Sequence, residues 1–167
     1  MSKVAPPTHK LPRTILTRAD VNRCMREIEA VESFMSDSAV RKSGTNSIQT
    51  PKLSKMLDDF CVLNGLNLLQ LADRQAITIT FKYLRDHAPV LHYSFASEPM
   101  PDFTQKITDW SREKIDPFAL IQIGLSPSVI MGCRLRSTNK IFDMSLRKAF
   151  EREKHQLAEA IKNLAAS

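Results

Sequence analysis

The stretch that decides the fold runs from Ser128 to Arg147 and reads SVIMGCRLRSTNKIFDMSLR. Two short, mainly apolar stretches, residues 129–135 and 140–142, lie on either side of Ser137-Thr138-Asn139. Ser, Thr and Asn favour turns because their side chains bond nearby backbone groups, so the pattern predicts two short strands joined by a turn.

Four residues of this stretch have local roles that follow from their chemistry. Gly132 would let one strand pass close to the backbone of a neighbour, and Lys140 follows the turn. Asp143 and Ser145 stand where the second strand would give way to a helix, a position in which such side chains cap helix N-termini. These roles are structural, and none of them is catalytic.

A long amphipathic helix is predicted after Ser145, which would cap it, and this helix would run to about residue 164. Its apolar stripe consists of Leu146, Phe150, Leu157, Ile161 and Leu164. At 1.5 Å per residue, such a helix would be roughly 30 Å long.

The residues before this stretch predict the rest of an α+β module over 89–167. Residues 91–95 alternate apolar and polar side chains as a half-buried strand does, and residues 118–123 form a second apolar, strand-like run. Between the two, one face of a short helix is marked by Phe103, Ile107 and Trp110. The predicted order is therefore β-α-β-β-β-α, with a small mixed sheet and the long terminal helix.

Residues 17–88 predict a small helical domain of about three helices. Thr17 can cap the first, whose stripe contains Val21, Cys24, Met25, Ile28, Val31, Phe34 and Met35. A polar connection is predicted from Ser36 to Gln49, and Thr50-Pro51 is expected to open a second helix that ends at Gly65.

The third helix is predicted from Ile77, Phe81 and Leu84, in preference to a strand, although residues 77–81 also alternate. At the other end of the domain, residues 1–16 contain three prolines, three basic residues and no acidic residue. They predict a basic, extended and disordered arm.

The composition is typical of a soluble globular protein, with 43% hydrophobic and 25% charged residues and a formal net charge of +6. No apolar run approaches the ~18 residues that a membrane-spanning helix needs, so neither a span nor a secretory signal is expected. The three cysteines and four histidines are scattered without metal-ligand spacing. We therefore expect no metal and no cofactor.

Residues 128–147 resemble the C-terminal signature of the delta subunits of F-type ATP synthases, also called oligomycin-sensitivity-conferring proteins. The positions that register with this signature are Gly132, Arg136, Lys140, Asp143, Ser145 and Arg147. The sequence departs from the signature at Met131 and Met144, where glycine is usual. The resemblance extends over about residues 90–164, whereas the family's six-helix N-terminal bundle has no counterpart in residues 1–88.

The resemblance implies a non-catalytic stator subunit. Its N-terminal helices would contact the alpha and beta subunits of the catalytic head, and its C-terminal module would hold a b-type helix of the peripheral stalk. The side chains expected to grip that helix are Phe150, Leu157, Ile161 and Leu164. Such a subunit would be peripheral, on the cytoplasmic side of the cell membrane rather than an organellar inner membrane, and would have no small-molecule substrate.

Two other function classes compete with this interpretation. An enzyme is not favoured, because the sequence contains no nucleophile, phosphate-loop or metalloprotease motif. A small basic protein that binds single-stranded nucleic acid is the serious alternative, since basic residues cluster at Arg134, Arg136, Lys140, Arg147 and Lys148. The aromatic residues Tyr93 and Phe142 fall at positions that periodicity assigns to a core, so no exposed stacking platform is expected.

Overall fold

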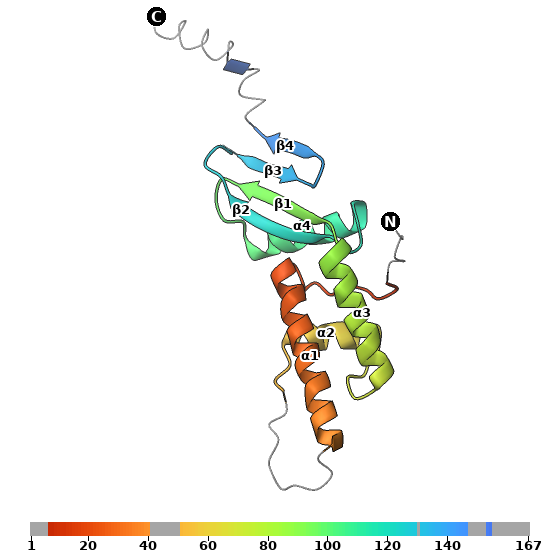
Figure 1. Ribbon diagram of the computed structural model, residues 1–167. Coiled ribbons are helices and arrows are strands. Elements are labelled where there is room, and N and C mark those ends of the chain that lie inside the picture. The colour runs from red at the N-terminus through yellow and green to blue at the C-terminus, as the bar shows by residue number, and fades with distance from the viewer. Residues whose placement is uncertain (1–6, 41–50, 130, 147–152, 155–167) are drawn as a thin grey trace, which may run out of the picture. The chain divides into compact units, whose positions relative to one another are not determined.

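A computed structural model describes residues 7–40, 51–129, 131–146 and 153–154 (Figure 1). The elements follow the order α1, α2, α3, β1, α4, β2, β3, β4. The chain is therefore α+β, as predicted, and the helices and strands through β4 come in the expected order. It divides into two compact units, Met1–Val90 with Gln105–Ile121 and Leu91–Thr104 with Gln122–Ser167. The predicted boundary at 88–89 lies close to the first break, but the first unit also takes in most of α4.

Helix α1 spans Arg18–Val40 and begins at a closed hydrogen-bonded box. The Thr17 backbone N–H donates to Asp20 Oδ2 at 2.8 Å, and the Asp20 N–H donates back to Thr17 Oγ1 at 3.2 Å. The predicted stripe is confirmed from Val21 to Val31, where all five residues are buried. The prediction of a loop from Ser36 was wrong for residues 36–40, which continue the helix, because no proline or glycine stops it there.

Helix α2 spans Lys55–Asn64 and begins later than predicted. Its N-cap is Ser54, whose side chain accepts from the Leu57 N–H, and Glu27 of α1 accepts the Ser54 N–H at 2.9 Å. These two bonds fix the start, so Pro51 is not the first helical residue. Gly65 ends the helix at φ 64°, as expected of a left-handed C-cap.

Helix α3 spans Leu71–His87, so the preference for helix over strand is confirmed. Ile77, Phe81 and Leu84 are fully buried, whereas Ile79 points outward. Figure 1 shows α1, α2 and α3 grouped together in the first unit. Their shared core includes the Phe60 and Phe81 rings, whose centroids are 5.0 Å apart.

The sheet has the order β2-β1-β3-β4, with strands Val90–Phe95, Leu120–Leu125, Gly132–Arg136 and Ile141–Ser145 for β1 to β4 (Figure 1). Strand β3 is antiparallel to both β1 and β4. Two bonds between β1 and β2, from Leu120 N to Pro89 O and from Ser126 N to Phe95 O, join residues at the same sequence offset, as in a parallel pair. The sheet is therefore mixed.

Helix α4 spans Pro101–Lys114 and connects β1 to β2. The predicted inner face was wrong, because Phe103 and Trp110 are about half exposed and the fully buried positions are Thr108 and Ser111. Small side chains there allow close packing of the helix, and the Ser111 hydroxyl satisfies itself by donating to the Ile107 carbonyl at 2.7 Å.

Several predicted strand limits also shift. Strand β2 begins at Leu120 because Asp116 Oδ1 accepts the Phe118 N–H at 2.7 Å and holds that residue in a turn. Strand β4 continues to Ser145, so this residue lies in the sheet, and the start of the helix that it was predicted to cap lies outside the described residues. None of the helices in the described part of the chain is long and apolar enough to cross a bilayer.

Candidate functional site

The β3–β4 hairpin brings most of the signature positions together. Gly132 and Ser145 are directly opposed across the two strands, and Gly132 has φ 87°. A Cβ atom at Gly132 would collide with the Met144 carbonyl oxygen and would lie 3.2 Å from Ser145 Cα. The close backbone approach predicted for Gly132 is therefore present, and only glycine satisfies both the dihedral and the space.

Asp143 and Ser145 form a local pair within β4. Asp143 Oδ1 accepts from the Ser145 hydroxyl at 2.5 Å and from the Ser145 N–H at 3.0 Å. These bonds, assisted by Arg134 at 3.6 Å, lower the pKa of Asp143 below its usual value. The Leu146 N–H donates to the Met131 carbonyl at 3.0 Å, so hydrogen bonding between the two strands continues just beyond Ser145.

Arg136 and Lys140 lie at the other end of the hairpin, beside its turn. Arg136 is exposed and is opposed by His92 of β1 and Ile141 of β4. The Lys140 carbonyl accepts from the Ser137 N–H at 2.8 Å, which closes the turn. The hairpin thus contains five of the six signature residues, and Arg147 lies outside the described residues.

The four side chains predicted to grip a partner also lie outside the described residues; they are Phe150, Leu157, Ile161 and Leu164. Between the first and second of them, Glu153 and Lys154 are described, and both are helical and exposed.

The strand register separates two faces in the second unit. Residues that oppose each other in antiparallel strands point to the same face. His92, Ser94, Arg134, Arg136 and Asp143 therefore share a polar face, and Tyr93, Phe95, Cys133, Leu135, Phe142 and Met144 share an apolar face. The expected burial is confirmed for Tyr93 but was wrong for Phe142, which is 49% exposed on the edge strand β4.

In the first unit, residues 7–16 form an ordered N-terminal belt, so the expected disorder of residues 1–16 does not hold for them. The Lys10 N–H donates to the Asn64 side chain at 2.7 Å, and that side chain donates back to the Lys10 carbonyl at 3.0 Å. The Ile121 N–H of β2 donates to the Leu16 carbonyl at 2.8 Å. Ile15 is fully buried between these anchors.

Arg112 of α4 holds the N-terminal belt through side-chain hydrogen bonds to its backbone. Its guanidinium donates to the carbonyls of Pro12, at 2.9 Å, and of Ile15, and its Nε donates to the Ala119 carbonyl at 3.4 Å. Burial lowers the pKa of Arg112 to about 10, against the opposing effect of Asp109. The group therefore stays protonated at neutral pH and keeps donating to the Pro12 and Ile15 carbonyls of the belt.

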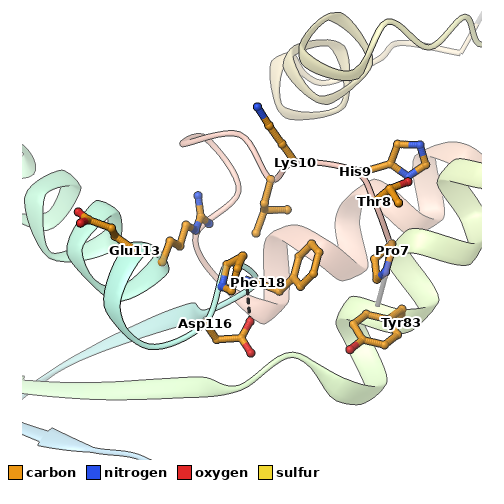
Figure 2. Close-up of a pocket in the computed structure, with 11 residues that line it drawn as sticks. Pro7, Thr8, His9, Lys10, Tyr83, Glu113, Asp116 and Phe118 are labelled. Carbon is orange, nitrogen blue, oxygen red and sulfur yellow. Dashed lines mark hydrogen bonds between the residues drawn. The ribbon is translucent and has the colours of Figure 1, made fainter. Parts of the chain in front are cut away.

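A hollow of about 720 Å³ lies beside the N-terminal belt (Figure 2). Tyr83 and Phe118 line it with their rings in edge contact, 5.9 Å apart. Its charged groups are largely occupied by neighbours in the chain: Arg112 by carbonyls, Glu113 by Lys114 at 2.7 Å and Asp116 by the Phe118 N–H. Figure 2 shows the Lys10 ammonium pointing away from Phe118 and Asp116. Within the described part of the chain, the charged side chains that line the hollow, other than Lys10, are thus engaged by neighbouring groups.

Sequence reasoning missed the N-terminal belt and its partners Asn64, Thr80 and Arg112. Thr80 donates to the Ala76 carbonyl at 2.8 Å and also lies 2.8 Å from His9 Nδ1, so His9 must donate to it. The residues joined by these contacts are separated by 54 to 100 positions in the sequence, so no local sequence pattern predicts them.

No group of three or more His, Cys, Asp or Glu side chains that could hold a metal ion occurs among the described residues. In comparisons with known proteins, no family model and no curated protein matches the chain.

Proposed function

We propose that this chain is a stator subunit of an F-type ATP synthase, with no catalysis of its own, similar to the delta subunits whose signature it resembles. The observation that carries the proposal is the contact of Gly132 with the backbone of Met144 and Ser145. The signature requires a glycine at this position, and the hairpin has a physical need for one there. A chance match of residue letters would not predict that need.

In this proposal the two parts of the chain bind different partners. The β3–β4 hairpin directly precedes residues 147–167 in the sequence. It is stabilised by the close packing of Gly132 on β4 and by the hydrogen bond between Asp143 and Ser145. Leu157, Ile161 and Leu164 then bind a b-type stalk helix through an apolar stripe with a charged rim. The three helices of residues 17–88 contact the alpha and beta subunits of the head. The subunit is peripheral, on the cytoplasmic side of the cell membrane.

The distribution of side chains on the sheet argues against the nucleic-acid alternative. Proteins that bind single strands combine basic groups with aromatic rings on one surface, so that bases stack while phosphates are neutralised. Here His92 and Arg136 lie on the polar face, whereas Tyr93 and Phe142 lie on the opposite, apolar face. One strand of nucleic acid could not reach both sets from the same side of the sheet.

The proposal is tested by purifying the tagged chain from native membranes. We expect the chain to leave the membranes in a wash of low ionic strength without detergent. In mild detergent it should instead co-purify with the alpha, beta and b-type subunits. Release that requires detergent would oppose the peripheral assignment. A preparation free of synthase subunits that shifts single-stranded RNA in a salt-sensitive manner would favour the alternative.

A further inference from the structure

The outer edge of β4 is open among the described residues, because β4 ends the strand order β2-β1-β3-β4 (Figure 1). The strand contains no proline, and its large side chains are apolar although solvent reaches them. Ile141 is 64% exposed, Phe142 49% and Met144 50%. An exposed apolar edge strand is a template for pairing with another chain, and proteins that do not use such an edge usually protect it.

The hydrogen bonds of β4 show which of its backbone groups point outward. The Leu146 N–H donates to the Met131 carbonyl, so the backbone of Leu146 faces β3. Because this direction alternates along a strand, Ile141, Asp143 and Ser145 direct their N–H and C=O groups away from the sheet. The Ser145 N–H is already bonded to Asp143 Oδ1 at 3.0 Å. The outward donors that remain for another strand are therefore those of Ile141 and Asp143.

A second copy of β4, running antiparallel with the two Phe142 residues opposed at a two-fold axis, uses both of these donors. Ile141 of each copy then pairs with Asp143 of the other. The register with the axis at Asp143 would oppose two carboxylates, which is destabilising, and would need the occupied Ser145 N–H. The register with the axis at Ile141 would pair Asp143 with Asn139, which lies in the turn outside β4. The axis at Phe142 is therefore favoured.

This register is also complementary in charge. The exposed Arg136 of β3 lies directly opposite Ile141, which would in turn lie opposite Asp143 of the second copy. Neighbouring strands are about 4.8 Å apart, so the long arginine side chain can extend across Ile141 toward that carboxylate. Arg134 of the same copy already lies 3.6 Å from Asp143. Each Asp143 would thus lie between its own Arg134 and Arg136 of the other copy.

We propose that the chain forms a homodimer by antiparallel pairing of β4 with β4 of a second copy, with Phe142 at the two-fold axis. The strand has only 5 residues, so the contact is small and the dimer dissociates on dilution. The inference rests on the described β3–β4 hairpin alone and does not depend on the proposed function.

Sedimentation equilibrium of the full chain over a range of concentrations tests the dimer. Ile141→Pro removes an outward N–H from each copy without removing a bond between β3 and β4, and edge strands tolerate proline. We expect the native chain to pass from monomer to dimer as its concentration rises, and Ile141→Pro to raise the Kd about tenfold or more. The matched control Leu69→Ser removes a 73% exposed apolar side chain from the first unit and should leave the Kd unchanged.

A native chain that stays monomeric at every concentration would overturn the inference. So would an Ile141→Pro variant that dimerises like the native chain, or an equal weakening in Leu69→Ser, which would assign the association to apolar surface of the first unit.

If Ile141→Pro unfolds, cysteine cross-linking decides. Phe142→Cys and the equally exposed, same-face control Met144→Cys are prepared in a Cys133→Ser background and treated with a mild oxidant. Cβ atoms of directly opposed residues are close enough for a disulfide, whereas the two residues 144 are offset along the strands in this register. We expect Phe142→Cys to form a disulfide-linked dimer at least severalfold faster than Met144→Cys. Equal rates, or no linked dimer in either variant, would refute pairing at Phe142.

Discussion

Gly132 and Ser145 face each other across β3 and β4 at a separation that excludes any side chain on Gly132. The Gly132 φ of 87° is one that residues with a Cβ rarely adopt, and the Met144 carbonyl oxygen occupies the place of that atom. The backbone φ angle of Gly132 and the nearby backbone atoms of Met144 and Ser145 thus each restrict position 132 to glycine. This contact fixes the hairpin from which the terminal segment continues.

Replacement of Gly132 by alanine should lower the free energy of unfolding by about 2–4 kcal/mol, because backbone strain and a steric clash add together. Thermal or denaturant unfolding measures this change. Gly124→Ala is the matched control, since a Cβ there has no neighbour within 4 Å, and we expect an effect within about 0.5 kcal/mol. Equal midpoints for the two variants would show that the β3–β4 register is different.

Ser145→Ala should raise the pKa of Asp143 toward its ordinary value, because two donors of Ser145 favour the ionised carboxylate. The carboxyl carbon chemical shift of Asp143, followed by NMR against pH, measures this directly. The backbone N–H of residue 145 remains in the variant, so the pKa should rise only in part. Ser97→Ala, at an exposed position, should leave the titration unchanged.

The sign of the accompanying pH dependence follows from the lowered pKa. A carboxyl group whose pKa is lower in the folded state stabilises the fold above its unfolded pKa of about 3.9, and that contribution is lost as the pH falls through the folded value. Ser145→Ala should therefore reduce the loss of stability on acidification below about pH 4. A steeper acid dependence in the variant would contradict the assigned hydrogen bonds.

Arg112→Met should release the N-terminal belt and lower the free energy of unfolding by about 2–4 kcal/mol, because the buried carbonyls of Pro12 and Ile15 lose a charged donor. Hydrogen exchange should accelerate at the Ile121 amide, which is bonded to Leu16. The control is Lys114→Met, which removes an exposed ion pair with Glu113. Unchanged protection of Ile121 in Arg112→Met would mean that the belt is held by its other anchors.

The sequence predicted the elements whose information is local. The stripe from Val21 to Val31, the Gly65 cap and the close approach at Gly132 each follow from periodicity or from the chemistry of one residue. These features could be derived because the cause and the effect lie within a few positions of each other.

The failures come from contacts between distant residues. Glu27 fixes the start of α2 by accepting the Ser54 N–H. Arg112 orders the N-terminal belt, which was predicted to be a disordered arm, by donating to the Pro12 carbonyl. The inner face of α4 was misassigned because periodicity assigns the larger apolar residues to the core, whereas the structure buries Thr108 and Ser111. Neither hydropathy nor spacing contains this tertiary information.

In the proposed function, Leu157, Ile161 and Leu164 couple this chain to a stalk helix. Leu157, Ile161 and Leu164 should contribute to assembly more than to folding, because they form the apolar stripe that we propose binds the stalk helix. Their joint replacement by serine should leave a soluble, folded protein. The matched control replaces the exposed Glu153 and Lys154 by serine, which should leave binding intact.

The most direct measurement is a pull-down of the b-type subunit by the triple variant, combined with proton pumping by the reconstituted synthase. We expect a normal melting temperature, loss of the b-type subunit from the pull-down, and ATP hydrolysis that no longer drives proton transport. A triple variant that unfolds would assign these side chains to the core. A triple variant that still binds the b-type subunit and couples hydrolysis to transport would contradict the proposed function.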